Sequence, residues 1–158
     1  MELKKIKEII YKSLEELYEK DKYIIYNEKQ GKYNYGSERS IVFRFGIYFE
    51  NNFKKQFTSK EYEKYSIDIE YNRNITDKKI LPNWENGCIP DLIVHERGNN
   101  NNNLVVLEFK THWNDNQDKD KIKIKKLIDK NGVYKYRYGA TVLIEKEYSK
   151  KCVDWISL

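Results

Sequence analysis

Hydrophobic residues recur every three to four positions in two long stretches of the first third of the chain. In residues 2–20, aliphatic side chains alternate with Lys and Glu in the pattern of a helix with one buried face. A second stripe, aromatic and aliphatic, covers about 38–56 and follows Ser37, a residue type favoured at a helix N-cap. Residues 27–36 contain two glycines and no apolar period. We therefore predict two amphipathic helices joined by an irregular connection.

From residue 67 onward the apolar period shortens to 2, which is the period of a β-strand. Residues 67–72 form the first predicted strand, and residues 75–87, rich in turn-forming residues, form a connection. Pro90 opens a second strand. A third strand, 104–110, follows the asparagine run 99–103 and is predicted to pair with the second as a hairpin.

The last third of the chain returns to a helical period and then to strands. Residues 118–130 carry Ile and Leu among lysines and predict a third helix. Residues 136–145 predict a further strand, and residues 153–156 a short edge strand. The expected order is helix, helix, strand, strand, strand, helix, strand (α-α-β-β-β-α-β). We therefore expect an α/β fold in which helices flank a mixed β-sheet, within one domain spanning 1–158.

Composition and charge narrow the picture only slightly. No apolar run approaches the ~20 residues that span a bilayer, so we expect a soluble, cytoplasmic protein. Cys88 and Cys152 lack the spacing of a zinc site and are expected to be reduced structural thiols. The net charge is +5, and its excess lies in residues 109–158, with 12 basic against 7 acidic side chains. This excess is compatible with a polyanionic partner or with a Lys-rich solvated surface.

Chemistry-bearing residues gather at the predicted hairpin. Asp91 begins its first strand, while Glu108 and Lys110 end its second strand and share one face by their period of 2. The second strand is otherwise apolar, and charges at the end of a buried strand are costly unless they are paired or bind a metal. Two nearby carboxylates suit Mg²⁺ or Mn²⁺, and a lysine beside them can orient water or stabilise charge on a phosphate. The alternative is a Glu108–Lys110 surface ion pair with Asp91 capping a turn.

The same residues carry a resemblance to a known family. Ile89-Pro90-Asp91, 17 residues before Glu108-Phe109-Lys110, resembles the PD-(D/E)XK nuclease signature. The surrounding segments 67–73, 90–98 and 103–110 resemble a group of small PD-(D/E)XK proteins from bacteria and their mobile elements. The resemblance covers about 37–145 and implies a restriction-endonuclease-like core and metal-dependent hydrolysis of nucleic acid, with DNA as the expected substrate.

The resemblance also implies further site residues. Glu38, at the start of the second helix, matches the position from which that family often adds an acidic residue to the metal site. Acidic residues also favour a helix N-terminus for electrostatic reasons, and Glu50 is a weaker substitute. The expected metal ligands are Asp91, Glu108, Glu38 and Phe109, with Mg²⁺ or Mn²⁺ as the cofactor.

Further side chains could act beside this trio. Glu70 could add a carboxylate to the catalytic group and Arg73 could hold a phosphate, unless the two form an ion pair. His112 lies two residues beyond Lys110 and is predicted to share its face if the strand continues. The basic run 119–126 could follow a phosphate backbone or form a solvated helix face. The expected substrate contacts are Arg73, His112, Lys121, Lys125 and Tyr136, the last by stacking on a base.

The leading hypothesis from the sequence is thus a Mg²⁺-dependent DNA endonuclease. The alternative is a protein that keeps the nuclease fold and binds nucleic acid or a protein partner without turnover. No separate DNA-reading module is visible in the chain, so sequence specificity would come from loops or from a second copy in a homodimer.

Overall fold

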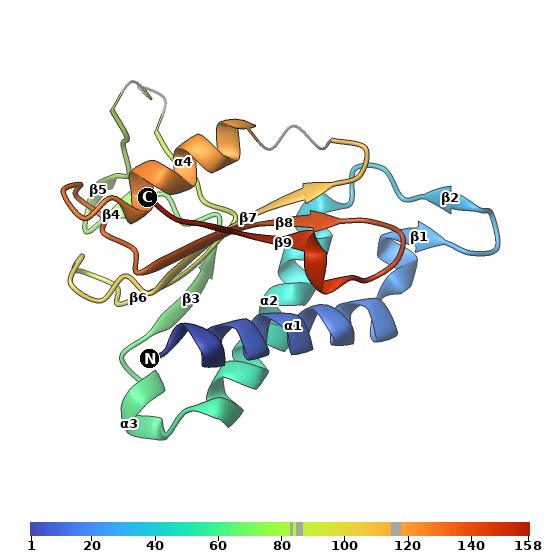
Figure 1. Ribbon diagram of the computed structural model, residues 1–158, viewed down its shortest axis with the longest axis horizontal. Coiled ribbons are helices and arrows are strands. Elements are labelled where there is room, and N and C mark those ends of the chain that lie inside the picture. Colours follow the sequence, from blue (N-terminus) through green and yellow to red (C-terminus); the bar gives the residue numbers. More distant parts are fainter. Residues whose placement is uncertain (83, 85–86, 115–117) are drawn as a thin grey trace.

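A five-stranded sheet forms the centre of the protein (Figure 1). The computed structural model describes residues 1–82, 84, 87–114 and 118–158. The strand order is β3-β6-β7-β8-β9. The bounds are Ser66–Ile69 for β3, Leu92–His95 for β6, Val105–Thr111 for β7, Tyr138–Ile144 for β8 and Val153–Ile156 for β9.

The sheet is mixed because one of its ladders is parallel. β6 pairs antiparallel with both β3 and β7, and β8 pairs antiparallel with β9. β7 and β8 are parallel, with Val105 opposite Tyr138. Parallel neighbours need a crossover connection, and helix α4 (Asp118–Ile128) lies between them in the chain. The predicted hairpin of β6 and β7 is confirmed.

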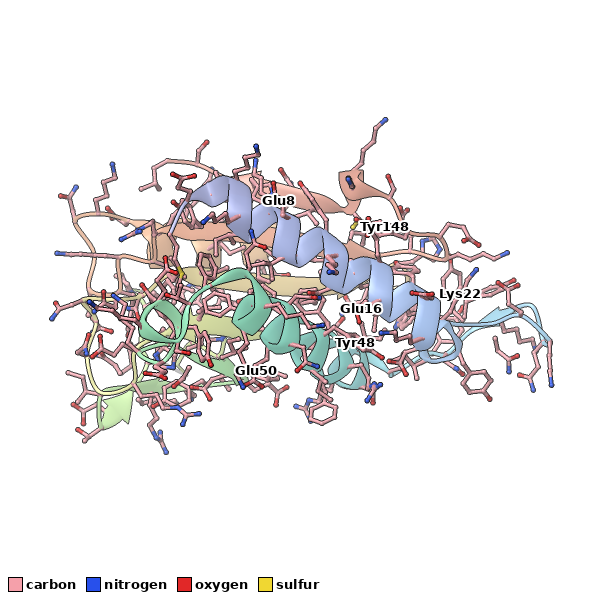
Figure 2. All side chains as sticks on the ribbon, turned by 90° about the horizontal axis from the view of Figure 1, so that it is seen from below. Glu8, Glu16, Lys22, Tyr48, Glu50 and Tyr148 are labelled. Atoms are coloured by element: carbon pink, nitrogen blue, oxygen red, sulfur yellow. The ribbon has the colours of Figure 1, made fainter. Side chains whose placement is uncertain are left out.

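Helices cover both faces of the sheet (Figure 1). Helix α1 (Leu3–Lys20) and helix α2 (Glu38–Gln56) lie side by side on one face, as Figure 2 shows from below. Their apolar stripes pack with Leu92, Leu107 and Phe109 in the larger core. Helix α4 covers the other face, where Ile124 and Leu127 pack with Val106. Alternate strand residues thus face different helices, so the register fixes which side chains meet α4.

The smaller elements were not expected from the sequence. Two short ladders, Tyr26–Asn27 with Lys32–Tyr33 (β1 and β2) and Arg73–Asn74 with Asp77–Lys78 (β4 and β5), lie in or directly beside the segments predicted to be connections. The remaining short elements are helix α3 (Ser59–Tyr62) and the 3₁₀ turns η1 (Lys22–Ile24) and η2 (Lys150–Cys152). Residues 83, 85 and 86 of the predicted connection 75–87 lie outside the described residues.

Most predicted elements are confirmed, with two local corrections. The mixed α/β class and all three long helices are found, with α2 at its expected bounds. Ser37 does precede α2, but its hydroxyl donates to the carbonyls of Ile24 and Asn34 instead of capping the helix. The first strand ends at Ile69, because Glu70 adopts a left-handed conformation with φ +52°. Both cysteines are free and buried, and no helix among the described residues is long and apolar enough to cross a bilayer.

Candidate active site

Asp91, Glu108 and Lys110 meet at one end of the β6–β7 hairpin. Leu92 pairs with Leu107, so Asp91, just before β6, lies beside the position of Glu108 on the neighbouring strand. The backbone N–H of Phe109 donates a hydrogen bond of 2.6 Å to Asp91 Oδ2. This bond holds the Asp91 carboxylate against β7, and the expected proximity of the two carboxylates is confirmed.

Glu108 is a buried carboxylate with only one of its oxygens partnered. It is 1% exposed, and its Oε2 accepts a 2.6 Å hydrogen bond from Lys123 Nζ, on α4. Its Oε1 is buried without a hydrogen-bond partner among the described residues. Burial, and then the negative charge of Asp91, raise the pKa of Glu108 well above its usual value. Burial also raises the pKa of Asp91, against the stabilising N–H of Phe109. The nearby positive charges therefore do not fully offset the burial and mutual repulsion of the Asp91 and Glu108 carboxylates.

Lys110 is held as an ammonium group. Its Nζ lies 3.0 Å from Asp120 Oδ2, on α4, and its side chain is 16% exposed. Burial alone would lower the pKa of Lys110, but Asp120 first, and then Glu38 and Asp91, raise it above its usual value. A lysine that stays protonated cannot take a proton from water. Its chemistry is to place a positive charge beside the carboxylates.

Two site residues, Asp120 and Lys123, were missed by the sequence analysis. They came within the basic run 119–126, which was expected to face a phosphate backbone or solvent. In the structure both lie on the buried stripe of α4: Asp120 is three residues before Lys123 and four before Ile124, and Lys123 is four residues before Leu127. Lys123 Nζ also donates to the carbonyl of Ile89 (3.3 Å) and lies 3.9 Å from Asp120 Oδ1. The signal was a polar residue at an apolar position of the helical period.

The alternative interpretation, an ion pair between Glu108 and Lys110, is wrong. Each charge of β7 instead takes its partner from α4: Glu108 pairs with Lys123, and Lys110 pairs with Asp120. These two ion pairs, of opposite orientation, hold β7 against α4. They also leave Asp91 with no ion-pair partner among the described residues.

Glu38 and Glu70 line a hollow beside Asp91. The hollow measures about 180 Å³ and is bounded by Glu38, Arg39, Val42, Ile69, Glu70 and Asp91. Glu38 Oε2 accepts a long hydrogen bond of 3.4 Å from the Thr111 hydroxyl, and its negative charge contributes to the raised pKa of Asp91. The N-terminal end of α2 therefore brings a third carboxylate toward the hairpin. The substitute Glu50 pairs with Lys54 at 2.6 Å on the outer surface of α2 (Figure 2).

Glu70 has different neighbours from those predicted. It pairs with Arg39 at 2.9 Å, whereas Arg73 donates to the carbonyl of Asn72. The strand predicted over 67–72 would place Asp68 and Glu70 on one face, and this is wrong because Glu70 lies beyond the end of β3. Asp68 instead accepts from His95 at 2.8 Å and from Arg97. These two partners outweigh its burial and lower the pKa of Asp68.

The site has more negative than positive charge. It contains the four carboxylates of Glu38, Asp91, Glu108 and Asp120 and the two ammonium groups of Lys110 and Lys123, a formal charge of −2 if all are ionised. Such a charge and such hard oxygen atoms fit a divalent cation. Among the residues that the structure describes, no three His, Cys, Asp or Glu side chains form a group that could hold a metal. Mg²⁺ does not need one, since it commonly uses one or two carboxylates and keeps several waters.

The predicted substrate contacts are scattered. Lys121 pairs with Asp154 at 2.7 Å, Lys125 is exposed on α4, and Arg73 is exposed on β4. His112 lies in a turn after β7, which ends at Thr111, so the strand does not continue to it. Tyr136 is 2% exposed and accepts a hydrogen bond from Lys79 at 3.1 Å. Its ring is enclosed in the core under α4 and is not on a surface where a base could stack.

The chain was also compared with known proteins. No protein-family model matches it. No curated protein and no solved structure matches it either. The functional interpretation therefore depends on the chemistry of the residues at the end of the β6–β7 hairpin.

Proposed function

We propose that this chain is a Mg²⁺-dependent nuclease with a restriction-endonuclease-like core, acting on DNA. The observation that carries the proposal is the meeting of two under-compensated carboxylates, Asp91 and Glu108, beside the ammonium group of Lys110. Glu108 Oε1 is buried without a partner, and both carboxylates have raised pKa values. A perturbed pair of this kind is more common at functional sites than in purely structural cores.

The fold supports the same proposal. Helix α2 is followed by three antiparallel strands, β3, β6 and β7, and α4 then leads to β8 alongside β7. This helix, three-strand, helix, strand order agrees with the core that the PD-(D/E)XK resemblance implies. The signature residues lie directly before its second strand and on its third strand, at the end where the two carboxylates meet.

Asp91 and Glu108 would hold the metal ion, with Glu38 as a third carboxylate beside the hollow. A bound Mg²⁺ supplies positive charge that acidifies water and stabilises the oxygens of a phosphodiester under attack. Asp91 is oriented for this role by the Phe109 N–H, which occupies Oδ2. The role proposed for Phe109 is therefore this backbone bond, in addition to any contact of its carbonyl with the ion.

Lys110 would stabilise the phosphate. Asp120 keeps the ammonium charged and limits its motion, so the positive charge is in place before the substrate arrives. Without a metal ion, Lys123 neutralises the Glu108 carboxylate. This contact would weaken when a metal ion binds the same carboxylate. The two lysines thus have different roles, one toward the substrate and one toward the ligand.

The test is a cleavage assay on plasmid, linear duplex, single-stranded DNA and RNA with Mg²⁺, Mn²⁺ or EDTA. We expect cutting with Mg²⁺, none in EDTA, and roughly a 100- to 1,000-fold loss of rate in Lys110→Ala. The matched control is Lys130→Ala, an exposed lysine after α4. Cutting that is insensitive to EDTA, or a Lys110→Ala variant as fast as the parent, would refute the proposal.

A second candidate is a nuclease fold that binds nucleic acid without turnover. The observation that favours it is the 2.6 Å contact of Lys123 with Glu108, because the ammonium already neutralises the carboxylate that a metal would need. Calorimetric titration with Mn²⁺ separates the two candidates. Saturable binding that Asp91→Asn and Glu108→Gln weaken favours the nuclease. Nucleic-acid binding with neither metal binding nor cleavage favours the second candidate.

A further inference from the structure

Four aromatic rings from distant parts of the chain form one cluster beside the candidate site. Tyr33 of β2 stacks on His112 with ring centroids 4.8 Å apart and an interplanar angle of 21°. The Trp113 ring lies 5.5 Å from that of Tyr33, tilted against it, and 5.3 Å from that of Tyr35 in an edge-on contact. We call these four residues the aromatic platform. It joins the β1–β2 hairpin to the turn that follows β7.

The platform is open to solvent. Tyr35 is 72% exposed, His112 is exposed, and Tyr33 and Trp113 are partly exposed. Only Trp113 and the supporting ring of Tyr26, which meets Tyr33 edge-on at 5.3 Å, also pack against the core. Aromatic side chains that are left exposed beside each other are the arrangement on which nucleic-acid bases stack.

The chain connects the platform directly to the candidate site from two sides. His112 and Trp113 follow Lys110 and Thr111 at the end of β7, and Tyr35 precedes Glu38 by three residues. The Thr111 hydroxyl, between Lys110 and His112, donates to Glu38. The end of β7 and the β1–β2 hairpin lie on the same side of the molecule (Figure 1).

The surroundings of the platform carry exposed positive charge. Lys29 and Lys32 on the hairpin are exposed, and Arg39 at the start of α2, whose side chain is 87% exposed, pairs with Glu70. Lys146 lies over the Tyr26 ring at 4.4 Å. Cations that flank stacked rings suit a strand whose phosphates run beside its bases.

We propose that the aromatic platform binds unpaired nucleotides and thereby directs a single-stranded or frayed segment of nucleic acid to Lys110 and the carboxylates. In a duplex the base faces are covered by their neighbours, so protein rings can stack only on bases that are unpaired. This inference rests on the proposed function for its substrate class. It adds that single-stranded segments bind more tightly than duplex of the same sequence.

The experiment measures binding and cleavage separately. Fluorescence anisotropy of a labelled single-stranded oligonucleotide, and of its duplex, is measured in EDTA, where we expect no cutting. Tyr35→Ala and His112→Ala are expected to bind the single strand roughly 5- to 150-fold more weakly, the range for loss of one stacking ring. Tyr35→Phe keeps the ring and should bind like the parent. Phe43→Ala is the matched control, because Phe43 is 57% exposed on α2 outside the platform.

The outcomes distinguish this inference from the proposed function. Thermal melts first establish that the variants, at exposed positions, fold as the parent does. If the parent prefers duplex, or if Tyr35→Ala and His112→Ala bind single strands as the parent does, the platform role is wrong even where Mg²⁺-dependent cutting is found. If the platform variants lose single-strand binding but the parent never cuts, the inference holds and the proposed nuclease activity fails.

Discussion

The buried ion pair of Glu108 and Lys123 predicts strongly non-additive effects on stability. Lys123→Met leaves the Glu108 carboxylate, 1% exposed, without its partner at 2.6 Å, and loss of one member of a buried pair costs about 3–5 kcal/mol. Glu108→Gln removes the negative charge but keeps an acceptor for Lys123, so a smaller loss of about 1.5–3 kcal/mol is expected. The whole free energy of unfolding of a typical domain is only about 5–15 kcal/mol, so both losses are large.

The double variant Glu108→Gln/Lys123→Met should recover most of this stability. It contains neither buried charge, so the cost of an unpaired buried charge, which dominates each single variant, is absent. We expect its free energy of unfolding to lie within about 1 kcal/mol of the parent, a coupling of roughly 3 kcal/mol or more between the two sites. Removal of the pair should also abolish Mn²⁺ binding, which separates the stability of the site from its function.

The assay is urea unfolding of the four proteins at pH 7 in EDTA, followed by tryptophan fluorescence. The control is Lys121→Met, because the Asp154 side chain that pairs with Lys121 is 53% exposed. The free energy of unfolding of this variant should fall by less than about 1 kcal/mol. If the two single effects add up to that of the double variant within about 0.5 kcal/mol, the reasoning about the buried pair is refuted.

Three further predictions concern packing, pH and ligand binding. Gly139→Ala on β8 would place a Cβ 2.4 Å from Ile124 Cγ2 on α4, so we expect the free energy of unfolding in urea to fall by about 1–3 kcal/mol. We also expect weaker activity, because the displaced helix α4 carries Asp120 and Lys123. A variant as stable as the parent would contradict this. Burial lowers the pKa of Lys79 from 10.5 to about 8, so the folded protein binds fewer protons than the unfolded chain between these values, and this contribution to stability rises with pH across that window. Lys79→Met should remove that slope in unfolding curves from pH 7 to 11 and raise stability at pH 7 by about 1–3 kcal/mol, and an unchanged slope would disprove it. Mg²⁺ should raise the melting temperature of the parent and not of Asp91→Asn; equal shifts would show that Asp91 is no ligand.

The long elements could be predicted because their hydrophobic period reports directly on burial. Every buried aliphatic and aromatic position of α1 and α2 follows the helical stripe, and β6 and β7 are apolar runs of the length expected for buried strands. The position of Asp91, Glu108 and Lys110 could be predicted for the same reason. A hairpin fixes which ends of its two strands are neighbours, whatever packs on them.

The features that were not predicted from the sequence, or were predicted wrongly, have no such periodic signal. β1, β2, β4 and β5 have two residues each, too few to show a period of 2. Glu70 is left-handed at the end of β3, which reverses the face predicted for a regular strand. The aromatic platform joins residues 33 and 35 to residues 112 and 113, and contacts of that sequence separation depend on how the β1–β2 hairpin packs.

Helix α4 shows most clearly what sequence reasoning could not decide. Its run of lysines is compatible with a solvated face, and Lys125 does lie there, yet Lys123 and Asp120 occupy apolar positions of the same helix. A structural helix would place aliphatic residues at those two positions, since a buried ion pair seldom stabilises more than a packed apolar pair. The two positions of α4 where stability is lost in this way are those that pair with Lys110 and Glu108. Charges retained against stability beside the end of the hairpin where Asp91 and Glu108 meet support the proposed role of this site in binding or catalysis.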